Sequence, residues 1–202
     1  LALRSLDMPV VLTDSFVPEL DNMVNTGLQD REGAHLATEY LIQNGHARIA
    51  FAGPEIRPGG VLEQRFLGYQ DALHDNGIAF DPSHVFYSEF GTDKTIELGR
   101  QIAAREDITA VFATADILAA GIMSGVQQSG KQVPQDISIV GFDDIRWCRM
   151  MNPTLTTIRQ NTEEKGRLAA EYMIRLLEGE ALETHNVILP VSLVERGSVT
   201  KR

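Results

Sequence analysis

Four short apolar runs alternate with helix-forming segments through the middle of the chain. The runs lie at residues 48–52, 85–87, 109–114 and 137–142. Between them, apolar residues recur at helical spacing, as at Leu62, Phe66, Tyr69 and Leu73. Strands that are apolar throughout and alternate with helices are typical of parallel βαβ units with right-handed crossovers. The pattern therefore predicts an α/β fold built on a parallel sheet.

The two ends of the chain break this alternation. In order, they contain an extended segment at 9–13, an irregular stretch around Gly27, a helix at 31–44, a helix capped by Asn161 or Thr162, and a strand at 187–195. We find no internal repeat and no flexible linker between these segments.

Composition limits the class of protein. The chain has 202 residues, of which 43% are hydrophobic, so it can bury a core. Its formal net charge of −10 argues against a nucleic-acid-binding surface, which needs a basic stripe. No apolar run approaches the roughly 20 residues that cross a bilayer, so we expect a cytoplasmic protein without membrane contact. Cys148 is the single cysteine, and we expect it to pack in the core.

Four side chains follow the ends of successive predicted strands, where open α/β sheets hold ligands. They are Arg65, Phe90, Asp116 and Asp143. A carboxylate, a guanidinium group and an aromatic ring together suit a hydroxyl-rich ligand. Each residue also has a structural interpretation. Arg65 could form an exposed ion pair, Phe90 could pack under a loop, Asp116 could be the N-cap of its helix, and Asp143 or Asp144 could cap the next turn.

The motifs of common catalytic and metal sites do not occur in the sequence. The five histidines show no metal-ligand spacing, and the G-x-S-x-G nucleophile motif and the phosphate-binding loop are not found. We therefore expect no catalytic residue, no metal and no cofactor, and a protein that is not an enzyme.

Motifs along nearly the whole chain resemble the effector-binding core of the lactose repressor/galactose repressor (LacI/GalR) family of bacterial transcription regulators. They are P-V-V-L-T-D at 9–14, R-E-G-A-H-L-A-T-E-Y-L-I-Q-N-G-H-A-R-I-A-F-A-G-P at 31–54, R-F-L-G-Y at 65–69, T-A-V-F-A-T-A-D-I-L-A-A-G at 109–121, V-P-Q-D-I-S-I-V-G-F-D-D at 133–144, P-T-L-T-T-I-R-Q at 153–160 and L-P-V-S-L-V-E-R-G-S at 189–198. They occur in the family's order.

The resemblance implies a two-lobed core like that of periplasmic sugar-binding proteins, with parallel sheets flanked by helices. Residues 1–30 would end the first lobe, 31–158 would form the second lobe, 159–182 a helix returning to the first, and 183–202 the final strand and tail of the second. The first lobe would be incomplete in this chain. The family's helix-turn-helix headpiece would lie outside the chain.

The resemblance also implies roles for particular residues. The positions of Arg65 and Asp143 hold the effector in the family, Phe90 matches an aromatic wall, and Asp14 and Gln160 match further pocket positions. The sequence departs from the family at Ala115, where many members carry a polar side chain.

An apolar cluster after the acidic turn predicts a homodimer. Met150 and Met151 lie in a loop that local rules expect to be polar, and such residues are enriched at interface cores. The resemblance implies that this loop and helix 116–129 contact a second copy. On the helix, Ala120 and Met123 would face the partner. The cluster could instead fold back onto its own lobe, and Trp147 could line the pocket rim.

Together these observations favour the effector-sensing core of a bacterial transcription regulator, which would reach operator DNA only through the headpiece. The expected effector is a sugar or sugar derivative, with a nucleoside or purine as the second choice. The alternative function is a solute-binding protein of a sugar uptake system. An enzyme on a doubly wound sheet is a third class, because fold does not fix function.

Overall fold

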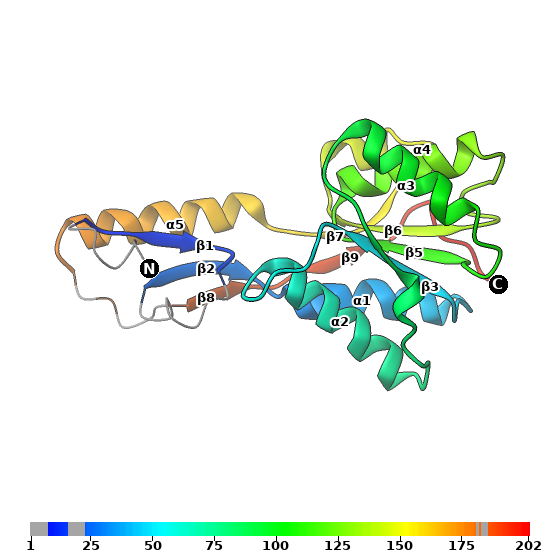
Figure 1. Cartoon of the computed structure of the whole chain (residues 1–202). Helices are drawn as coiled ribbons and strands as arrows, with labels where there is room; N and C mark the ends of the chain where they lie inside the picture. The colour runs from blue at the N-terminus through cyan, green and yellow to red at the C-terminus, as the bar shows by residue number, and fades with distance from the viewer. Residues whose placement is uncertain (1–7, 16–22, 181, 183–185) are drawn as a thin grey trace.

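A computed structural model describes residues 8–15, 23–180, 182 and 186–202. These residues form two sheets, one of six strands and one of three (Figure 1). Within the described residues, no helix is both long enough and apolar enough to cross a bilayer.

The larger sheet has the strand order β4-β3-β5-β6-β7-β9. Its strands are β3 (Ile49–Gly53), β4 (Val85–Tyr87), β5 (Ala110–Ala113), β6 (Ser138–Asp143), β7 (Thr156–Arg159) and β9 (Ser192–Val194). Neighbouring strands are parallel except β7 and β9, which are antiparallel. The predicted α/β fold with a parallel sheet is confirmed.

Helices cover both faces of the larger sheet. They are α1 (Asp30–Gln43), α2 (Val61–Asp75), α3 (Thr92–Ala103) and α4 (Asp116–Gln128), with short 3₁₀ turns at Pro82–His84 and Arg146–Arg149. Figure 1 shows α1 and α2 on one face and α3 and α4 on the other. Successive residues of a strand serve opposite faces: Phe112 packs in the core under α1 and α2, and Val111 in the core under α3 and α4.

Glycine permits α3 and α4 to approach closely. A Cβ atom at Gly125 would lie 2.0 Å from the carbonyl oxygen of Ile96, so only glycine fits there. This close approach fixes the two helices against each other.

The smaller sheet has the order β1-β2-β8 and is parallel throughout. Its strands are β1 (Val11–Thr13), β2 (Val24–Leu28) and β8 (Asn186–Leu189), and α5 (Thr162–Leu177) packs against β1 and β2. Asn161 is the N-cap of α5, since its side-chain oxygen accepts from the Glu164 amide at 3.1 Å. The chain passes between the two sheets after β2, after β7 and after β8.

The structure corrects the prediction at three places. The stretch around Gly27, predicted to be irregular, contains strand β2. Residues 156–159, for which no strand was predicted, form β7. The single strand predicted at 187–195 is wrong, because the chain leaves one sheet at Pro190 and enters the other at Ser192. A proline cannot donate to a strand ladder, which suits this break. As a result, β8 belongs to the smaller sheet and not to the second lobe.

Candidate functional site

Six polar side chains gather where the two sheets adjoin, and we call them the polar cluster. They are Asp14, Asp30, Arg65, Asp143, Gln160 and Lys165. Four of them stand at the carboxyl ends of parallel strands: Asp14 after β1, Asp30 after β2, Asp143 at the end of β6 and Gln160 after β7. Arg65 comes from α2 and Lys165 from the first part of α5. The cluster therefore draws on both sheets at the edge where such folds bind ligands.

Arg65 is held rigidly in the interior. The residue is 7% exposed, its Nε donates to Asp30 Oδ1 at 2.8 Å, and another guanidinium nitrogen donates to the carbonyl of Thr114. Its guanidinium carbon lies 3.6 Å from the centre of the Phe142 ring. The exposed ion pair considered for Arg65 is therefore wrong, since the pair with Asp30 is buried.

Two carboxylates of the cluster each have one oxygen that takes no hydrogen bond from the described part of the chain. Asp30 accepts hydrogen bonds from Arg65 through Oδ1, and Asp14 accepts a hydrogen bond from Lys165 through Oδ2. Asp30 Oδ2 and Asp14 Oδ1 are buried and take no hydrogen bond from the described residues. Burial raises the pKa of Asp30, although the Arg65 charge opposes the shift. Buried acceptors of this kind favour a ligand that donates hydrogen bonds.

Asp143 is the third carboxylate, and the Gln160 amide donates to it. Burial raises the pKa of Asp143 to about 6, with the Arg65 charge opposing. The neighbouring Asp144 has a different environment. Burial acts on it too, but hydrogen bonds from Arg196 and Arg159 outweigh burial and lower its pKa. The following 3₁₀ turn has Ile145 as its N-cap, so neither aspartate has the capping role considered for it.

Asp116 is structural, but it is not the N-cap predicted from its position. Ala115 is the N-cap of α4, and no side chain caps this helix end. The fully buried Asp116 carboxylate accepts instead from the Ile145 amide at 2.9 Å, the Cys148 thiol at 3.0 Å and the Thr157 hydroxyl at 2.5 Å. Asp116 thus ties α4 to β7 and to the loop after β6, and Cys148 is buried there as expected.

Phe90 lies apart from these hydrogen bonds, on the wall of a groove between α3 and α4. The groove is also lined by Ile117, Ala120 and Trp147. Phe90 is 60% exposed, so it is not a core residue packed under a loop. Its role as an aromatic wall for the effector stays a prediction.

The residues predicted at a dimer interface divide into two groups. Met150 is 80% exposed, and Ala120 lines the groove. Met123 is only 3% exposed and Met151 packs partly against the same core, so Met123 is not available to a second copy. The prediction that Met123 faces a partner is corrected, because the face of α4 that carries it packs on the sheet.

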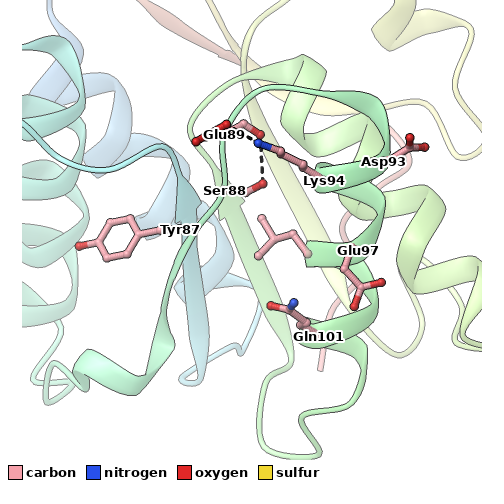
Figure 2. Close-up of a pocket in the computed structure, with 8 residues that line it drawn as sticks. Tyr87, Ser88, Glu89, Asp93, Lys94, Glu97 and Gln101 are labelled. Atoms are coloured by element: carbon pink, nitrogen blue, oxygen red, sulfur yellow. Dashed lines mark hydrogen bonds and ion pairs between the residues drawn. The ribbon is translucent and has the colours of Figure 1, made fainter.

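A second hollow, beside β4 and α3, is lined mostly by polar side chains, but its ion pair is exposed to solvent. Figure 2 shows Lys94 meeting Glu89 at one end and Tyr87 pointing away from the other labelled side chains. The Lys94–Glu89 pair is exposed, with side-chain exposures of 60% and 80%. In the described part of the chain, no group of three or more His, Cys, Asp or Glu residues could hold a metal ion. The polar cluster is therefore the stronger candidate.

Sequence reasoning missed two members of the cluster, Asp30 and Lys165. Asp30 follows β2, the strand that was not predicted. Lys165 stands near the start of α5, where the helix dipole disfavours a positive charge. That unfavourable position was a signal that an anionic partner lies nearby, although it could not identify Asp14.

Comparisons with known proteins agree with this geometry. Residues 38–199 match the model of the periplasmic binding protein-like domain. The chain is 32% identical over 197 residues to the HTH-type transcriptional repressor PurR of Vibrio atlanticus, covering 97% of this chain and 58% of that protein. The chain thus spans little more than half the length of this curated relative.

Two solved structures are similar over almost the whole chain. The transcriptional regulator CelR in complex with cellobiose gives a TM-score of 0.86 at 30% identity, over 93% of this chain and 58% of that one. The lac repressor dimer bound to operator and an anti-inducer gives a TM-score of 0.84 at 27% identity, over 98% of this chain and 68% of that one. The chain belongs to the periplasmic binding protein-like domain family, and the relatives that it resembles are transcriptional regulators of the LacI type.

Proposed function

We propose that the chain is the effector-sensing core of a bacterial transcription regulator and that it binds a small carbohydrate at the polar cluster. The observation that carries the proposal is the convergence of buried, hydrogen-bonding side chains from both sheets on one place. The relatives are transcriptional repressors, which are not enzymes. They lend no support to the sugar-uptake alternative.

In the proposed mechanism, the ligand joins the two sheets. Asp143 and Arg65 belong to the six-stranded part, and Asp14 and Lys165 belong to the three-stranded part. A ligand that bonds both sets favours one relative orientation of the parts, and a DNA-binding headpiece would sense that orientation. Because such coupling is reciprocal, operator DNA must change ligand affinity by the factor by which ligand changes DNA affinity.

Calorimetric titration of the full-length protein with cellobiose, ribose, galactose and adenosine tests this function. We expect at least one sugar to bind and to be recovered chemically unchanged. Asp143→Asn should weaken binding by about 1.5 to 3 kcal/mol, the range of a charge-assisted hydrogen bond. Asp93→Asn is the matched control, since Asp93 is exposed at the start of α3, outside the cluster. Equal affinity in both variants would remove Asp143 from the site, and a chemically altered sugar would refute simple sensing.

We also propose a homodimer through the loop that follows β6 and the exposed edge of α4. Large apolar side chains gather there: Ile117, Trp147 and Met150 are between 46% and 80% exposed. Exposed aromatic and methionine side chains in one patch are typical of interface cores. A two-fold dimer would bury the same patch on both copies.

Light scattering on the full-length protein tests the dimer. Met150→Glu should shift it towards monomer, because two carboxylates would face each other near the symmetry axis. Leu177→Glu is the control, since Leu177 is 67% exposed on α5, away from the patch. Met151 is a poorer probe because it packs partly against its own core. A Met150→Glu protein that stays dimeric would refute this interface.

A further inference from the structure

We infer that the polar cluster accepts uncharged or cationic ligands and excludes anionic ones such as phosphate esters and sugar acids, and that the pairing of Lys165 with Asp14 sets this selectivity. The inference rests on the proposed function, because it assigns a chemical class to the ligand of that site.

The charges of the cluster leave one carboxylate in excess. Its anions are Asp14, Asp30 and Asp143, and its cations are Arg65 and Lys165. Each cation is already paired, Arg65 with Asp30 and Lys165 with Asp14. Asp143 has the Gln160 amide as its hydrogen-bond donor. An incoming anion would therefore have to compete with a carboxylate that each cation already binds.

The atoms left without partners are acceptors. Among the residues that the structure describes, none donates a hydrogen bond to Asp30 Oδ2 or Asp14 Oδ1, and the Asp30 side chain is 0% exposed. A hydroxyl or ammonium group can donate to these oxygens. A phosphate dianion or a carboxylate can only accept hydrogen bonds. It would place further negative oxygens beside the Asp30 and Asp14 carboxylates, in a poorly solvated site.

The nearby arginines Arg159 and Arg196 do not reverse this balance. Both form ion pairs with Asp144, at 2.6 Å for Arg159 and 2.5 Å for Arg196. Arg196 also donates a hydrogen bond to the carbonyl oxygen of Leu155, just before β7, at 2.7 Å. These two cations have their own anion and carbonyl partners.

Lys165 is the residue on which the selectivity depends. Its side chain is 13% exposed, and it sits near the positive end of the α5 dipole, where a lysine is unfavourable without a counter-ion. Asp14 supplies that counter-ion from the end of β1. Removal of the Asp14 charge would release the Lys165 ammonium group to bind an anion.

Matched ligand pairs test the inference on the full-length protein by calorimetry. The pairs are ribose with ribose 5-phosphate, galactose with galactose 1-phosphate, and glucose with glucose 6-phosphate. We expect the neutral member of a binding pair to bind at least about tenfold more tightly than its phosphate ester. A phosphate ester that binds as tightly as its parent sugar, or more tightly, would overturn the inference and leave the proposed function standing. Failure of every sugar, including those of the broader panel, and of every ester would overturn both.

Two variants with opposite expected effects test the role of Lys165. Asp14→Asn should lower the ratio of sugar affinity to phosphate-ester affinity, because the Lys165 ammonium group loses its partner. Lys165→Gln should raise this ratio, because the cluster becomes more negative. Glu163→Gln is the control, since it removes one carboxylate from the same turn of α5 at an exposed position. The assignment of Lys165 is wrong if Glu163→Gln changes the preference as much as Asp14→Asn, or if Lys165→Gln leaves it unchanged.

Discussion

The six-stranded and three-stranded parts of the molecule differ in how completely they bury their apolar residues. In the larger part, Phe51, Phe112 and Phe142 are 0% exposed, and helices cover both faces of the sheet. In the smaller part, α5 contains no fully buried residue, and Ile174 and Leu177 on it are 56% and 67% exposed. Burial of apolar surface is the dominant stabilising term, so the larger part supplies most of the stability.

This difference assigns the two parts different tasks at the site. Arg65 is fixed by Asp30, Thr114 and the Phe142 ring, so its position is preorganised in the larger part. Lys165 and Asp14 hold each other in the smaller part, whose weaker packing permits movement. A ligand that contacts both would add most order to the smaller part.

Core truncation should show the largest contrast between the parts. Phe112→Ala should lower the free energy of unfolding by about 3 to 5 kcal/mol, since it leaves a cavity among buried side chains. Ile174→Ala on α5 should change the free energy of unfolding by less than about 0.5 kcal/mol, because that side chain is mostly exposed. Urea denaturation measures both values. Similar losses in the two variants would contradict the unequal packing.

The two ion pairs of the cluster should also differ. Arg65→Ala should cost about 3 to 5 kcal/mol of stability, because it leaves Asp30 buried without its partner. Lys165→Ala should cost about 1 kcal/mol, since Asp14 is 31% exposed and can gain water. Urea denaturation at pH 7 compares them, and an equal cost would mean that both pairs are equally desolvated.

Titration of Asp143 should give a smaller effect that depends on pH. Its pKa is raised to about 6 in the folded protein, so its contribution to stability is fully present below pH 3.8 and is lost as pH rises through 6. Asp143→Asn should remove this loss, which is at most about 3 kcal/mol because one pKa unit corresponds to about 1.4 kcal/mol. Thermal unfolding of wild type and variant at pH 4 and pH 8 measures it. The stability difference between variant and wild type should favour the variant more at pH 8 than at pH 4. An equal difference at the two pH values would refute the raised pKa.

The sequence predicts the larger part better than the smaller one for a physical reason. The strand at 137–142 is buried on both faces and therefore reads as a continuous apolar run, and residues at its carboxyl end, such as Asp143, follow from that placement. Strand β2 contains Asn25 and Gly27, which are uncommon in strands, so its pattern is weak. Asp30, which follows β2, was missed for the same reason.

Contacts between distant segments lie beyond what local patterns contain. Lys165 and Asp14 are 151 residues apart, and only the packing of α5 on β1 and β2 brings them together. The break between β8 and β9 is similar, because Pro190 indicates an interruption but does not say that the two halves join different sheets. The family resemblance supplied Asp14 and Gln160 as site residues, but not the partner of either.

Hydrogen–deuterium exchange with and without a saturating sugar tests most directly whether the ligand joins the two parts. The sugar is the one that calorimetry identifies, and the full-length protein is used. We predict slower exchange in the first turns of α5, near Lys165, together with slower exchange around Asp143 at the end of β6, and the larger change in α5. Protection confined to the six-stranded part, with α5 unchanged, would contradict a ligand held by the polar cluster from both sides.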